Sequence, residues 1–118
     1  EVYTDMSNNK EVVLCVSNSY QKKFYLNENF NGLPQGIRDE LKIMCVLYTE
    51  DIGGILELVF NEDGELDFRT SYEDGDFFYD EIGSVLKIKQ YQNEKRELLE
   101  SIETYYKIVF LGEGFEEE

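Results

Sequence analysis

The chain has 118 residues with 26 acidic and 11 basic side chains, a net charge of −15 and no histidine. This length predicts one domain with its own core, and a hydrophobic content of 42%, with nine Tyr and eight Phe, argues against intrinsic disorder. Without histidine the commonest general base and metal ligand is missing, and the negative charge repels nucleic acid and anionic membranes. We therefore expect a non-catalytic protein with no cofactor or metal site and no nucleic-acid or membrane partner.

The first half of the chain predicts a β-hairpin followed by a helix. Two β-prone runs occupy residues 12–17 and 22–27, and the Asn and Ser residues between them favour a turn. Pro34 suits the first turn of a helix, where its missing N–H would be unpaired in any case. Apolar residues then recur at helical spacing until Ile52, and the pair Gly53-Gly54 ends the helix.

The second half of this helix allows two interpretations. Residues 43–48 are all apolar, so a helix here would be buried on two sides or would lie at a contact between two copies of the chain. The alternative is a strand over residues 43–49, with the helix ending near Leu41, which the β-branched and aromatic residues support. We favour the helix.

A second hairpin follows. Residues 55–60 and 66–72 flank a turn that contains Gly64, a residue that tolerates positive φ. In the outgoing strand apolar and polar residues alternate, which is typical of a sheet with one solvent-exposed face. The residues expected on the buried face are Leu66, Phe68, Thr70 and Tyr72.

A long helix is predicted from about Tyr79 to Phe110. Its apolar stripe starts as Ile82, Val85 and Leu86 and resumes as Leu98, Ile102, Tyr105 and Val109. The polar residues between these groups predict curvature, a break near Asn93 or a central section in open solvent. The expected fold is therefore α+β, in the order ββαββα, with two β-hairpins forming an antiparallel sheet packed against a mid-chain helix and a long C-terminal helix. We expect a single domain over residues 1–118, with flexible ends at about 1–9 and 113–118.

The cysteines predict the compartment. Cys15 and Cys45 each lie in an apolar run, where a free thiol behaves as a small buried hydrophobic side chain. A disulfide between them is the alternative. Two cysteines, together with no recognisable signal peptide or membrane-spanning run, predict a reducing, cytoplasmic location.

The strongest signal is an acidic belt over residues 61–82. It contains nine acidic residues and a single base, Arg69. We interpret this belt as a surface that meets a basic protein partner, the alternative being that it only maintains solubility. The candidate partner-binding residues are Glu62, Asp63, Glu65, Asp67, Glu73, Asp74, Asp76, Phe77 and Phe78.

Three consecutive aromatic residues, Phe77, Phe78 and Tyr79, end this belt. One helix face cannot bury all three together. We interpret them as a hydrophobic staple that closes the loop onto the core. An exposed anchor for a partner is the alternative.

Known chemical motifs do not fit the chain. Aligning the calcium-loop pattern of an EF-hand on Gly64 or Gly75 places Val59 or Thr70 at the first ligand position. The main functional hypothesis is thus a binding or regulatory module, similar to immunity proteins or small chaperones. One alternative is a homo-oligomeric module, such as a homodimer, that associates through residues 43–48. Another is an acid–base enzyme or small-ligand binder that uses buried carboxylates.

The chain also resembles a small family of uncharacterised acidic proteins from anaerobic Gram-positive bacteria. The residues that carry this resemblance are LKIMCVLYTEDIGGI (41–55), DEIGSVLKI (80–88), and YYK (105–107) ahead of FLG (110–112). The resemblance covers nearly the whole chain. It implies a bacterial, cytoplasmic protein of unknown activity and adds no site residues.

Overall fold

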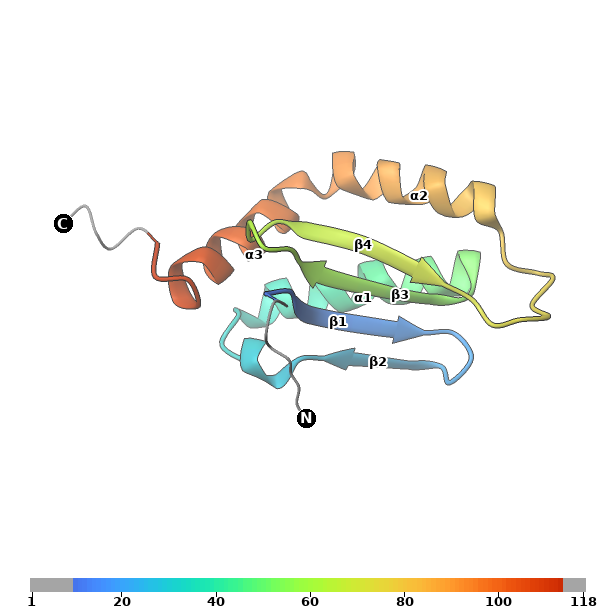
Figure 1. The fold of residues 1–118 in the computed structure, drawn as a ribbon, viewed down its shortest axis with the longest axis horizontal. Helices are drawn as coiled ribbons and strands as arrows, with labels where there is room; N and C mark the ends of the chain where they lie inside the picture. The colour runs from blue at the N-terminus through green and yellow to red at the C-terminus, as the bar shows by residue number, and fades with distance from the viewer. Residues whose placement is uncertain (1–9, 114–118) are drawn as a thin grey trace.

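A four-stranded antiparallel sheet with helices packed on one side forms the architecture in a computed structural model that describes residues 10–113 (Figure 1). The strand order is β2-β1-β3-β4. The elements are β1 (Val12–Asn18), β2 (Lys23–Leu26), a short 3₁₀ helix η2 (Glu28–Phe30), α1 (Gln35–Ile52), β3 (Ile55–Phe60), β4 (Leu66–Ser71), α2 (Glu81–Glu94) and α3 (Arg96–Val109). The predicted α+β fold built from two hairpins is therefore confirmed. The ends predicted to be flexible, residues 1–9 and 113–118, lie outside the described residues except for Glu113.

Residues 43–49 lie in α1, so the helical interpretation is confirmed and the strand alternative is wrong. The helix buries one face against the sheet through Leu41, Met44, Cys45, Tyr48 and Ile52. On its outer side Ile43 and Leu47 are 58% and 52% exposed. Of the six residues of this all-apolar stretch, two are thus exposed, Val46 is half-buried and three are buried.

The predicted C-terminal helix is divided into α2 and α3, so of the three alternatives the structure contains the break near Asn93. Lys95 forms the junction, with φ −105° and ψ 24°, while its N–H still bonds to the carbonyl of Tyr91. The change of direction lets α2 and α3 present different faces to one core. The apolar start of α2 is not part of that core, because its buried residues are Ser84 and Tyr91.

Stacked aromatic rings join the distant parts of the chain. The ring centroid of Phe60 in β3 lies 4.0 Å from that of Tyr106 in α3 and 5.4 Å from that of Phe30 in η2. All three side chains are buried. Such offset ring pairs stabilise a fold beyond the area that they bury.

The two cysteines are free and buried, as predicted. Their sulfur atoms lie 3.8 Å apart, joining β1 to α1. Burial raises the pKa of the Cys15 thiol, so the reactive thiolate is disfavoured at neutral pH.

Within residues 10–113, no helix combines the length and the apolar character that crossing a bilayer requires.

Candidate interaction surface

The acidic belt predicted over residues 61–82 does not form one continuous surface. Strand β4 separates its two halves, so that the turn at 61–65 and the loop at 72–80 lie at opposite ends of the sheet (Figure 1). A strand of six residues spans about 20 Å. The structure groups Glu62, Asp63, Glu65 and Asp67, here called the hairpin cluster, apart from Glu73, Asp74, Asp76, Phe77 and Phe78.

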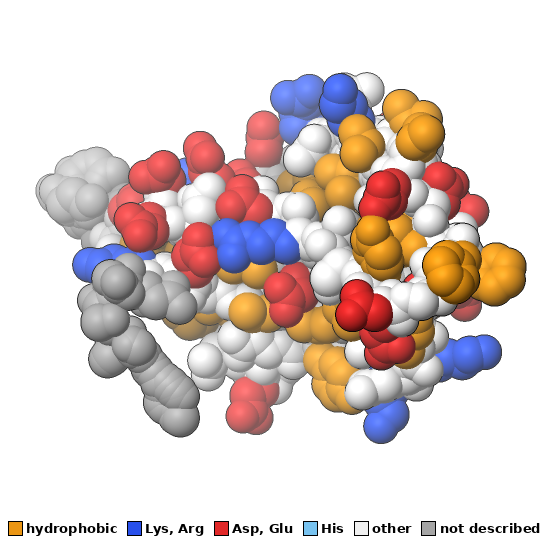
Figure 2. All heavy atoms as spheres, turned by 45° about the vertical axis from the view of Figure 1, so that its right-hand side comes forward, with side chains coloured by type: hydrophobic (Ala, Val, Ile, Leu, Met, Phe, Trp, Pro, Cys, Tyr) orange, Lys and Arg blue, Asp and Glu red, His pale blue; other side chains and the backbone are white. Residues whose placement is uncertain are grey.

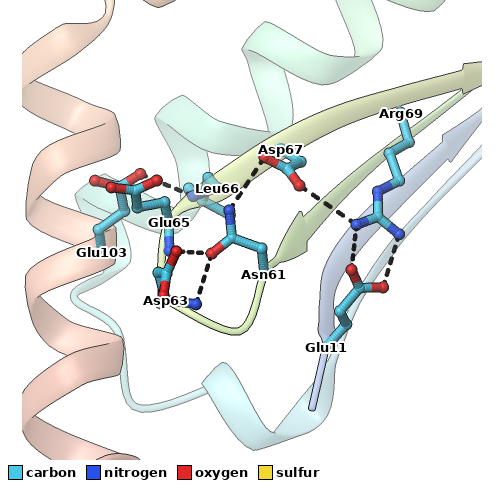
Figure 3. Close-up of polar contacts among 8 residues, drawn as sticks. All are labelled: Glu11, Asn61, Asp63, Glu65, Leu66, Asp67, Arg69 and Glu103. Atoms are coloured by element: carbon cyan, nitrogen blue, oxygen red, sulfur yellow. Dashed lines mark hydrogen bonds and ion pairs between the residues drawn. The ribbon is translucent and has the colours of Figure 1, made fainter. Parts of the chain in front are cut away.

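Asn61 organises the turn that carries the hairpin cluster (Figure 3). Its Oδ1 accepts hydrogen bonds from the backbone N–H groups of Asp63 (2.9 Å) and Glu65 (3.1 Å). The N–H of Leu66 donates to Glu103 of α3 at 2.8 Å. The turn is therefore fixed by contacts within the fold.

Arg69, the single base of the belt, is already neutralised within the chain. Its guanidinium donates to both carboxylate oxygens of Glu11, at 2.9 and 2.7 Å, and to Asp67 at 3.3 Å (Figure 3). The hydrogen bond from Arg69 lowers the pKa of Glu11. Asp67 thus supports the sheet, while Glu62, Asp63 and Glu65 are exposed.

The loop between β4 and α2 is held in place from several directions. The hydroxyl of Tyr20, from the β1–β2 turn, donates to Asp76 at 2.5 Å and accepts from the N–H of Glu73 at 3.0 Å. Asp76 also accepts from the N–H of Phe78 at 3.0 Å, and Asp80 caps α2 by accepting from the N–H of Gly83 at 2.8 Å. These bonds fix the backbone of the loop.

Tyr79 alone of the three consecutive aromatic residues closes the loop onto the core. Its hydroxyl donates to Ser84 at 3.1 Å and lies 3.4 Å from that of Tyr48, and its ring stacks on Tyr72 at 4.4 Å. Burial raises the pKa of Tyr48, which bonds to Ser84 at 2.6 Å. The staple interpretation is therefore correct for Tyr79.

For Phe77 and Phe78 the staple interpretation is wrong, because their side chains are 92% and 94% exposed. The physical reason is local: the Asp76 turn and the Asp80 cap fix the backbone on either side of them. Both rings are thus presented at the tip of the loop.

The start of α2 continues this apolar surface. Ile82 is 76% exposed, Val85 55% and Leu86 63%, so the stripe that the sequence suggested for the core faces outward. We define the β4–α2 patch as the half-buried Asp76 together with the exposed residues Tyr72, Glu73, Asp74, Phe77, Phe78, Asp80, Glu81, Ile82, Val85 and Leu86. Figure 2 shows hydrophobic side chains gathered on the face that includes this patch, with acidic side chains between them. Sequence reasoning missed the three α2 residues, although their spacing on one helix face was the available signal.

A hollow of about 500 Å³ lies within the β4–α2 patch. Its lining combines carboxylates with apolar groups: Asp74, Asp76, Asp80 and Glu81 with Phe77 and Ile82. A Lys or Arg side chain carries a cationic head on an apolar stem, and a cation is also attracted to the face of an aromatic ring. The hollow therefore suits a basic side chain.

The buried polar groups and the possible metal ligands provide less evidence for a functional site. Among residues 10–113 the buried polar side chains are the hydroxyl residues Ser17, Thr49 and Ser84, and no carboxylate is buried. The same part of the chain contains no group of three His, Cys, Asp or Glu side chains placed to hold a metal. The hypothesis of paired buried carboxylates gains no support from these residues.

Comparison with known families gives a match over most of the chain. The sequence profile described as "Family of unknown function (DUF6145)" matches residues 11–114. No curated protein and no solved structure matches the chain.

Proposed function

We propose that this chain, which belongs to the family of unknown function DUF6145, is a non-catalytic module that binds a basic protein partner through its β4–α2 patch. The observation that carries this proposal is the pair Phe77 and Phe78, both more than 90% exposed on a loop fixed by hydrogen bonds. Burying one such side chain contributes about 1.5–3 kcal/mol. Because the loop is already ordered, little of this free energy is lost in fixing it on binding.

Charge defines the kind of partner. Residues 72–86 contain five acidic residues and no basic one. A surface of this kind favours a segment in which Lys or Arg side chains alternate with apolar ones, and it speeds the encounter with such a segment. Salt should weaken the association because it screens exposed charges.

Charge reversal at each end of β4 tests the proposal. The double variant Glu73→Lys/Asp74→Lys should weaken partner binding by about tenfold or more, since it places two positive charges opposite a basic segment. The matched control is Glu62→Lys/Asp63→Lys, which changes the net charge by the same amount at the hairpin cluster. The partner is first captured from the native lysate at low salt, and affinities are then measured with the purified pair. Equal losses in both variants would show that only net charge matters.

The proposal also includes the cellular compartment in which this interaction takes place. As the family resemblance implies, we place the chain in the reducing cytoplasm of an anaerobic Gram-positive bacterium, and the two buried free thiols support a reducing compartment. A role like that of an immunity protein or a small chaperone suits a small acidic protein that meets a basic one, by analogy alone.

Self-association through α1 is the second candidate function. Ile43 and Leu47, four residues apart on the outer side of α1, are both more than half exposed. If two copies meet here, sedimentation should give the mass of a dimer, and Leu47→Glu should convert it to a monomer because the charge would be buried. A wild-type monomer at high concentration would contradict this second candidate.

A further inference from the structure

A second hollow, of about 550 Å³, lies between the β1–β2 hairpin and α1. Lys22 and Lys23 line it from the hairpin, and Lys42 lines it from the helix. Its volume lies in the range of small-molecule sites, about 300–1,000 Å³. None of the residues that line it belongs to the β4–α2 patch.

The charge of this hollow opposes that of the whole molecule. Three lysines and one carboxylate, Glu50, line it, while the chain as a whole carries −15. The described residues provide no ion pair for these lysines, whereas Lys87 and Lys95 pair with Asp51 and Glu40. The local formal charge is thus close to +2.

Protection of the sheet edge explains only part of this arrangement. Lysine on an edge strand discourages pairing with other chains, and this accounts for Lys23 on β2. It does not account for Lys42, which comes from α1. The turn also gives no reason for Lys22, whose φ of +56° is a conformation in which Gly, Asn or Asp is favoured.

The other lining residues offer complementary groups. Phe24 and Val46 provide apolar contact. Asn18 uses its Oδ1 to accept from the N–H groups of Tyr20 and Gln21, which leaves its NH₂ group to donate. On the inner side the buried hydroxyls of Ser17 and Thr49 bond to each other at 2.8 Å.

From this constellation we propose that the lysine hollow, defined by Asn18, Lys22, Lys23, Phe24, Lys42 and Val46, binds a small phosphate monoester with an apolar portion. A phosphate monoester carries close to two negative charges at neutral pH, which matches the local charge of the hollow. Ammonium groups act as point charges toward phosphate. The apolar portion lies against Phe24 and Val46.

Binding of phenyl phosphate tests this proposal, with inorganic phosphate and benzoate as comparison ligands. Backbone amide shifts of residues 17–24 are followed by NMR, and affinity is measured by calorimetry. Phenyl phosphate should bind saturably and more tightly than either comparison ligand. Lys42→Gln should weaken it about tenfold, as loss of one charge-assisted contact predicts.

Two further variants distinguish a specific binding site from general electrostatic attraction to lysine side chains. Lys22→Gly should weaken binding yet keep or raise the midpoint of thermal unfolding, because glycine adopts the positive φ without strain. Lys89→Gln, an exposed lysine of α2, should leave binding unchanged. Absence of saturable binding at about 10 mM phenyl phosphate, near the weak limit of specific sites, would overturn the proposal. So would an equal loss in Lys89→Gln, or benzoate binding as tightly as phenyl phosphate.

Discussion

Replacing Phe77 and Phe78 together by serine is expected to weaken partner binding about 100-fold, the scale of an interface hot spot. Both side chains are almost fully exposed, so the substitution removes no contact of the folded core. The midpoint of thermal unfolding should therefore stay where it is in the wild type. Calorimetry with the captured partner and a thermal unfolding curve measure the two effects.

The matched control for this variant is Ile43→Ser/Leu47→Ser. It also removes two exposed apolar side chains, but from the outer side of α1. Binding of the basic partner should be unchanged in this control. If both double variants lose affinity equally, the β4–α2 patch is not the binding surface.

Replacing Gly54 by alanine is expected to destabilise the fold by about 2–5 kcal/mol, because backbone strain and steric overlap add. Gly54 has φ +70°, and a Cβ there would lie 2.6 Å from the carbonyl oxygen of Ser71 and 2.6 Å from the ring of Tyr79. The carbonyl belongs to β4 and cannot move without breaking the sheet. Displacing Tyr79 would also release the loop that carries Phe77 and Phe78, so partner binding should weaken as well.

The variant Gly75→Ala measures the cost of backbone strain without the steric overlap expected at Gly54. Gly75 also has positive φ, +87°, but nothing lies within 4 Å of an added Cβ. Its substitution should therefore cost only about 1–2 kcal/mol. Denaturant unfolding of both variants measures the difference, and equal losses of stability would contradict the overlap at Gly54.

The sequence predicted the fold well where periodicity and turn residues agree. The strands around Gly64 and the helix between Pro34 and Gly53 follow from local preferences, and the structure contains them. The break at Lys95 was one of several possibilities, because a polar stretch in a helix is compatible with curvature, solvent exposure or a change of direction. Only the packing of α2 and α3 against one core decides among these.

The interaction surface was predictable only in part. Residues 61–82 are close in sequence, but an extended strand carries the acidic residues at its two ends apart. Apolar spacing likewise shows that Ile82, Val85 and Leu86 share a face of α2 without showing which face is buried. One neighbour that decides this is Tyr48, which bonds to Ser84 of α2 from a position 36 residues earlier in the chain.

Hydrogen exchange of the chain with and without its captured partner tests the central claim most directly. If the β4–α2 patch is the binding surface, backbone amides of residues 72–86 should exchange more slowly in the complex, since a bound partner excludes water and suppresses local opening. Amides of the turn at 61–65 should exchange at the same rate in both states. Protection confined to 61–65 or to the outer side of α1, with 72–86 unchanged, would contradict the account.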